Sequence, residues 1–192
     1  MKFPLTSLLT WLLHTVGFFK RHLAVILMLG LIAAFGRVIQ LGGFGEITSW
    51  MNISLEVVVE SARILLFLYA LGLADVRRGT LRIKRLFTDK ISRRQQVRVA
   101  RQTLKQHWLS VLCNVMVFLL IAAGINYLID LLAYETCLYL SLKQDGILAA
   151  DASEWTILLF FKNLSVIPFT LVFEAIFLLW ITNKIQNRAP AL

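Results

Sequence analysis

Apolar residues are grouped along the chain into long runs separated by polar segments. The longest runs cover 23–41, 53–74, 108–132 and 155–181, and each holds at least 19 residues. A helix of about 20 residues crosses the hydrocarbon layer of a membrane. Only helices or closed barrels satisfy their backbone in lipid, and these runs are too long for barrel strands. The pattern therefore predicts an all-α, polytopic membrane protein with four transmembrane helices.

The first 22 residues have a different pattern. Apolar residues recur there at helical spacing, at Leu5, Leu8, Leu9, Leu12, Leu13 and Val16. We interpret this segment as an amphipathic helix in the membrane interface, with a cleaved targeting segment as the alternative. The predicted organisation is an interfacial helix over 1–22 and a four-span membrane domain over 23–192.

Composition excludes a soluble enzyme. Hydrophobic residues make up 58% of the 192 residues and charged residues 16%, whereas soluble domains are nearer about 45–50% and about 25%. A water-soluble globule of this size could not bury so much apolar surface.

The positive charge is concentrated in one segment. Residues 75–107 hold eleven bases and two acids, an excess equal to the formal net charge of +9 for the whole chain. By the positive-inside rule, this basic loop and both termini are cytoplasmic. We therefore expect a multi-pass protein in a membrane of the bacterial inner-membrane type.

Ionisable residues inside the predicted spans are costly unless they are paired or hydrated. Six of them fall at similar depths on the extracytoplasmic side, and we predict one polar network of Arg37, Glu56, Glu60, Arg63, Asp130 and Lys162. Glu56, Glu60 and Arg63 also share one face of their helix, at spacings of four and three residues. Two interpretations stay open: a balanced ion-pair network that fixes the packing of the helices, or a polar path or coupling site.

Glu174 stands apart, in the inner half of the last predicted span. No base lies at its depth, and Asn114 is the nearest polar residue by depth. A carboxyl group in lipid holds its proton rather than remain charged. We expect Glu174 to be a proton carrier, a contact to another subunit, or a hydrogen-bond donor to Asn114 that locks two helices.

The basic loop contains a regular stripe of bases, Arg94, Arg98, Arg101 and Lys105, on one helical face. Ser92 and Gln95 match a capping box, which predicts that a helix begins at Ser92. The stripe suits anionic lipid headgroups at the cytoplasmic face or an acidic protein partner. Nucleic acid is not expected as a partner, because the loop has one Phe and no aromatic residues interleaved with the bases for base stacking.

No catalytic or metal-binding constellation is apparent, and we expect no cofactor. The histidines, His14, His22 and His107, lie at or outside the predicted cytoplasmic interface, at spacings unsuited to haem or metal ligation. The expected class is therefore a non-enzymatic membrane protein.

Several short motifs resemble one family of membrane proteins. Glu60-Ser61-Ala62-Arg63, followed by an apolar run and Arg77-Arg78-Gly79, is similar to the second span of the small membrane subunit of TRAP transporters. Ile167-Pro168 in the last span also resembles that family. The resemblance implies a non-catalytic partner of a larger, substrate-translocating subunit.

We therefore expect a non-enzymatic integral-membrane subunit of a larger membrane complex, with transport as the function of that complex. Its expected partners are another membrane subunit and anionic lipids. The alternatives are a homo-oligomeric channel or proton-coupled carrier that uses Glu174, and a lipid-modifying membrane enzyme.

Overall fold

The computed structural model describes residues 9–136 and 138–185, and every regular element among them is an α-helix. This confirms the predicted all-α class. Residues 1–8 of the predicted interfacial helix lie outside the described residues. In chain order, the described helices are α2 (Thr10–Arg21), α3 (Leu23–Gln40), α4 (Ser49–Leu71), α5 (Val76–Thr88), α6 (Lys90–Gln106), α7 (Trp108–Tyr134), α8 (Leu138–Gln144), α9 (Glu154–Leu164) and α10 (Val166–Ile181).

Among the described residues, three helical segments are long and apolar enough to cross a membrane: α3, α7, and α9 taken with α10. A fourth segment qualifies only as a bent pair, α4 with α5, whose axes differ by 88°. The bend follows from capping, because the Asp75 side chain accepts from the backbone N–H of Arg78 at 3.1 Å and begins a new helix. The predicted span 53–74 therefore corresponds to α4, which ends at Leu71.

The chain divides into two compact units, which we describe separately. The network unit comprises residues 24–65 and 121–169, and the basic unit comprises residues 1–23, 66–120 and 170–192. The division falls within α3, at its first residue, and within α4, α7 and α10.

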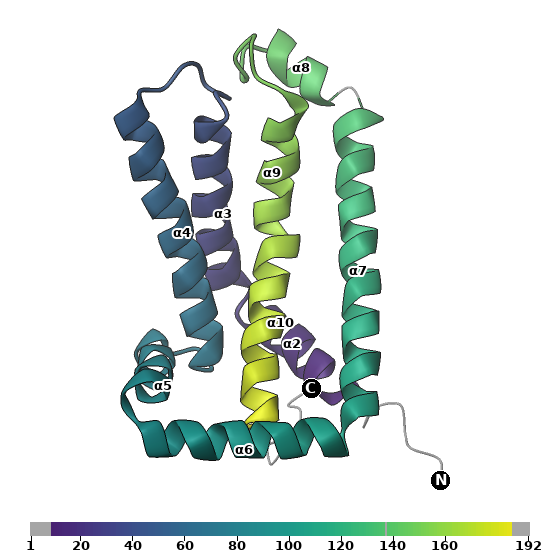
Figure 1. The fold of residues 1–192 in the computed structure, drawn as a ribbon. Helices are drawn as coiled ribbons and strands as arrows, with labels where there is room; N and C mark the ends of the chain where they lie inside the picture. The colour runs from purple at the N-terminus through teal and green to yellow at the C-terminus, as the bar shows by residue number, and fades with distance from the viewer. Residues whose placement is uncertain (1–8, 137, 186–192) are drawn as a thin grey trace. The chain divides into compact units, whose positions relative to one another are not determined.

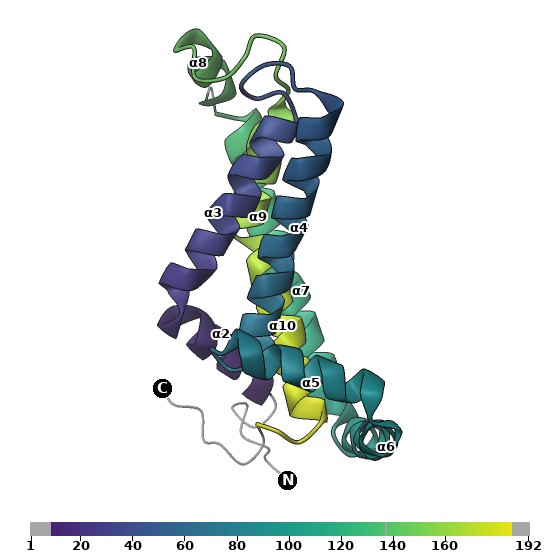
Figure 2. The same cartoon turned by 90° about the vertical axis from the view of Figure 1, so that its left-hand side faces the viewer.

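In the network unit, α3 and α4 lie side by side in both views (Figures 1 and 2). Small residues allow this approach. A Cβ atom added at Gly36 would lie only 2.5 Å from Val59 Cγ2, and Ala33, Val59 and Ala62 form a buried seam between the helices. A second core includes Ile129 of α7.

The last apolar segment is broken within the network unit. α9 ends at Leu164, α10 begins at Val166, and Ser165 separates them. Pro168 follows in the first turn of α10, where its missing N–H can be tolerated. The backbone N–H of Phe169 still donates to the Ser165 carbonyl at 3.0 Å, so the chain continues as a helix after the break.

In the basic unit, α2 packs into a core instead of presenting one apolar face outward. Trp11 is fully buried, with its ring centroid 4.5 Å from that of Phe173 on α10. The buried positions of α2 are Trp11, Leu12, Thr15 and Phe18, whereas Leu13 is exposed. Of the apolar positions expected from the sequence, Leu12 is buried, Leu9 and Val16 are partly buried, and Leu13 is exposed. The aromatic contacts to Phe173 decide the orientation.

The basic segment 75–107 is helical and consists of α5 and α6 (Figure 2, in which α6 is seen nearly end-on). The predicted start of a helix at Ser92 is wrong. Asp89 caps α6 instead, because its side chain accepts from the backbone N–H groups of Ile91 and Ser92 at 3.0 and 3.1 Å. Ser92 lies within the first turn, where its hydroxyl accepts from Gln96 Nε2 at 3.0 Å.

Candidate functional site

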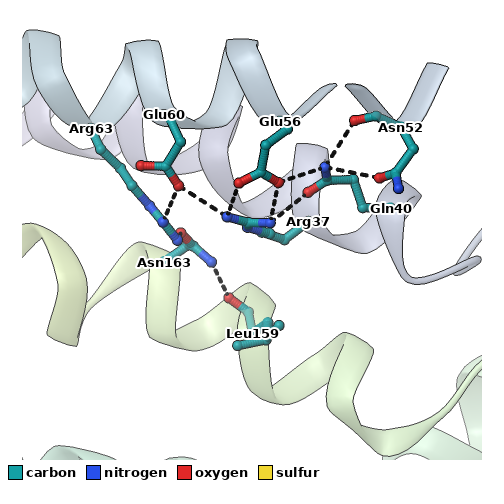
Figure 3. Close-up of polar contacts among 8 residues, drawn as sticks. All are labelled: Arg37, Gln40, Asn52, Glu56, Glu60, Arg63, Leu159 and Asn163. Atoms are coloured by element: carbon teal, nitrogen blue, oxygen red, sulfur yellow. Dashed lines mark hydrogen bonds and ion pairs between the residues drawn. The ribbon is translucent and has the colours of Figure 1, made fainter. Parts of the chain in front are cut away.

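Arg37 lies at the centre of a polar network between α3 and α4 (Figure 3). Its Nη1 lies 2.6 Å from Glu56 Oε2, and its Nη2 lies 3.0 Å from Glu56 Oε1. The same Nη2 donates to Glu60 Oε1 at 3.0 Å. The planar guanidinium therefore binds one carboxylate with two bonds and joins it to the next carboxylate on the same helix.

Arg63 extends the network from α4 to α9. Its Nη1 lies 2.6 Å from Glu60 Oε1, and its Nη2 donates to Asn163 Oδ1 at 2.8 Å (Figure 3). Asn163 is almost completely buried, and its Nδ2 donates to the Leu159 carbonyl at 2.7 Å. One chain of bonds thus connects three helices of the network unit.

The other end of the network reaches the first turn of α4. Gln40 Oε1 accepts from Arg37 Nη1 at 2.9 Å, while Gln40 Nε2 donates to Glu56 Oε2 at 2.9 Å. The same Nε2 lies 3.1 Å from both the carbonyl and the side-chain oxygen of Asn52. Gln40 therefore forms a hydrogen bond with each partner of the central ion pair, Arg37 and Glu56.

Two glycines of α3 set the geometry of the network. Gly36 precedes Arg37 and lets α4 approach, which brings Glu56 and Glu60 within reach of the guanidinium. Gly30 does the same toward α9, since a Cβ atom there would lie 3.1 Å from the Asn163 carbonyl oxygen. The close packing of α4 and α9 against these two glycines thus brings the charged side chains together.

The network is balanced in charge, with two acids and two bases, but it is uneven in exposure. The Arg37 and Arg63 side chains are 21% and 22% exposed, whereas Glu56 and Glu60 are 49% and 45% exposed. The bases therefore point into the unit, and the carboxylates lie at its surface. Arg63 Nε is buried without a hydrogen-bond partner among the described residues. The open side of the network therefore consists of carboxylate oxygens, which are hydrogen-bond acceptors.

Two residues assigned to this network from the sequence lie outside it. Asp130 and Lys162 form no ion pair with any described residue. Successive helical residues point about 100° apart. Because Asn163 faces Arg63, and Ile129 belongs to the buried core, the adjacent Lys162 and Asp130 point elsewhere. The sequence prediction compared the depths of these residues along their helices, but not the directions of their side chains around the helix axes.

The predicted hydrogen bond from Glu174 to Asn114 is wrong. Asn114 is fully buried in the basic unit, where its Oδ1 accepts from the backbone N–H of Leu12 at 2.9 Å and its Nδ2 donates to the Ser110 carbonyl at 2.6 Å. Glu174 is exposed, although both of its neighbours, Phe173 and Ala175, are buried. Asn114 instead fixes α2 against α7.

The basic stripe lies on α6 as a set of exposed side chains. Arg94, Arg98, Arg101 and Lys105 are all exposed. The stripe is therefore an accessible surface, as the spacing predicts, and whether it binds lipid or protein stays a prediction.

Comparisons with known proteins identify no family for this chain. No family model, curated protein or solved structure matches the chain. Over residues 9–136 and 138–185, no group of three or more His, Cys, Asp or Glu side chains is placed to hold a metal ion. The function must therefore be argued from the network and its surroundings.

Three members of the network were not assigned to it from the sequence: Gln40, Asn52 and Asn163. Gln40 follows Arg37 by three residues, which places both on one side of α3. This spacing is a signal in the sequence that places Gln40 beside Arg37. Asn163 lies at the same depth as Arg63, but only the packing of α3 against α9 shows that they meet.

Proposed function

We propose that this chain is a non-enzymatic integral-membrane subunit of a larger membrane complex, and that the complex is a transporter. In this proposal the apolar helices cross the membrane, and the basic segment and both termini are cytoplasmic. The partners are a second membrane subunit, which covers the open side of the network, and anionic lipids at the cytoplasmic face.

The half-exposed carboxylates carry this proposal. Glu56 and Glu60 lie on a helix that also exposes large apolar side chains, with Ile53, Val57 and Ile64 57%, 62% and 57% exposed. Lipid tails offer no hydrogen bonds to such groups, and a carboxylate exposed to them is strongly unfavourable. A second polypeptide with donor groups would satisfy both oxygens and bury the apolar residues beside them.

The resemblance to the small TRAP subunit supports transport as the function. Of the residues that carry it, Glu60 and Arg63 are ion-paired at 2.6 Å within the network. In this proposal, these two groups help to position a translocating partner.

A homo-oligomeric channel or carrier is the second candidate, and the exposure of Glu174 favours it. An outward carboxyl group on an apolar helix also needs a covering chain, and a second copy of the protein could supply it. The two candidates differ in what covers the polar groups.

Purification of the tagged full-length protein from its own membranes in mild detergent distinguishes them. The proposal predicts one other membrane protein in a fixed ratio, measured by mass photometry and quantitative mass spectrometry. A particle made only of this chain supports the homo-oligomer and contradicts the subunit. The variant Glu60→Ala should lower recovery of the partner, whereas Glu135→Ala, which replaces an exposed acid outside the network, should not.

A further inference from the structure

A cavity of about 150 Å³ lies in the basic unit, where the end of α4, helices α5 and α6, and the end of α10 meet. In Figure 1, α6 runs beneath the end of α10. The walls of the cavity are mainly apolar and include Leu71, Ile83, Leu86, Val97, Leu178 and Leu179. The cavity would therefore hold a hydrocarbon group.

Among the residues that the structure describes, bases and no acids line the same cavity. Arg82 and Lys184 are among the lining residues, and Arg85 follows Arg82 by one turn of α5. Burial, and then the charges of Arg82 and Arg85, hold the pKa of Lys184 below its usual range. Lys184 is thus close enough to both arginines to be repelled by them.

The two acids of the basic segment are engaged elsewhere. Asp75 binds Arg78, with 3.0 Å between Oδ2 and Nε, and Asp89 caps α6. Arg82 donates to the Leu71 carbonyl at the end of α4. The described lining residues of the cavity therefore carry positive charge, which suits an anion.

Gln96 provides a hydrogen-bond acceptor at the cavity. Its Nε2 donates to Ser92 Oγ at 3.0 Å, but its Oε1 is buried without a hydrogen-bond partner among the described residues. Gln96 also lines the cavity. A ligand that carries a hydroxyl group could donate to this oxygen and remove the cost of an unsatisfied acceptor.

We propose that this cavity binds one anionic phospholipid with a hydroxyl-bearing headgroup, such as a phosphatidylglycerol. Arg82, Arg85 and Lys184 bind its phosphodiester, Gln96 accepts from the headgroup hydroxyl, and an acyl chain covers the apolar wall. A soluble phosphate would match the bases but leave that wall exposed to water. Basic pockets between membrane helices on the cytoplasmic side bind lipid headgroups in this way.

The inference rests on the proposed membrane residence of the chain and not on its having a partner subunit. Extraction of the protein from membranes by carbonate would contradict membrane residence itself. Retention in the membrane without lipid selectivity would contradict only the lipid site, so the two failures are distinguishable.

The test is native mass spectrometry of the full-length protein in detergent, titrated with phosphatidylglycerol, phosphatidylcholine or glycerol phosphate. We expect retention of a single phosphatidylglycerol, and neither retention of phosphatidylcholine nor competition by glycerol phosphate. The double variant Arg85→Gln, Lys184→Met should bind it about thirtyfold more weakly, at about 1 kcal/mol per base. Lys184→Arg should bind normally.

The matched control removes the same charge from the exposed stripe, as Arg94→Gln with Arg98→Gln, and should change binding less than about threefold. Ala100→Phe, which fills the cavity and keeps every base, should abolish retention. Equal losses in the two charge variants, or full retention in Ala100→Phe, would show that general surface charge binds the lipid. Competition by glycerol phosphate would show that the ligand is soluble. Either result overturns the proposal.

Discussion

Gly36 and Val59 are in such close contact that a Cβ atom on the glycine would lie 2.5 Å from Val59 Cγ2. Gly36→Ala should therefore force α3 and α4 apart and lower the free energy of unfolding by about 1–3 kcal/mol. Thermal unfolding in detergent, followed by circular dichroism, measures this. Gly124→Ala is the control, because nothing lies within 4 Å of an added Cβ there. Equal midpoints for both variants would contradict the close packing, and adding Val59→Ala to Gly36→Ala should restore stability.

Glu60 binds two arginines, so the effect of a substitution depends on whether the new side chain can still accept their hydrogen bonds. Its Oε1 lies 3.0 Å from Arg37 Nη2 and 2.6 Å from Arg63 Nη1. Glu60→Ala leaves both groups short of an acceptor and should cost more stability than Glu60→Gln, which keeps an acceptor oxygen. The yield of folded protein after extraction measures the difference. Wild-type yields for both variants would mean that the network contributes nothing.

Asn163 provides the link from Arg63 to α9. Asn163→Leu removes the acceptor of Arg63 Nη2 at a nearly buried site, and we expect a loss of about 1–3 kcal/mol. Asn126→Leu is the matched control, because Asn126 donates only within its own helix, to the Ala122 carbonyl at 3.0 Å. Chemical unfolding in mixed micelles compares the two. A larger loss in the control would contradict the role of the link.

Acid should weaken the basic unit through His22. Burial, and then the charge of Arg21, lower the pKa of His22, and its Nδ1 lies 2.9 Å from the hydroxyl of Tyr69. A histidine with a lowered pKa in the fold favours folding while neutral, so stability is lost as the pH falls below about 6.5. Burial lowers the pKa of His14 in the same direction.

Unfolding midpoints measured from pH 8 to pH 5 test this. The wild type should lose stability toward pH 5, His22→Gln should lose less, and the double variant with His14→Gln should lose least. A profile of His22→Gln that parallels the wild type would show that this ring does not titrate with folding.

The sequence was sufficient to predict the helical class and the positions of the apolar segments, because long apolar runs leave few alternatives to long apolar helices. It also identified Arg37, Glu56, Glu60 and Arg63, since ionisable residues in apolar runs need partners. Depth alone could not assign Asp130 and Lys162, because pairing depends on the direction of each side chain around its helix. The burial of Trp11 on α2 was missed for a related reason: its packing against Phe173 is a tertiary contact with no local signal.

Site-specific photocrosslinking in intact membranes tests the central claim most directly, with a photoreactive residue at Val57, beside the carboxylates, and at Leu128 as the control. These positions are 62% and 63% exposed and belong to the same unit. If a second subunit covers the network, Val57 should form an adduct with one other polypeptide, which Glu60→Ala weakens, and Leu128 should form lipid adducts only. If Val57 also forms lipid adducts only, the network faces the bilayer and the subunit proposal is wrong.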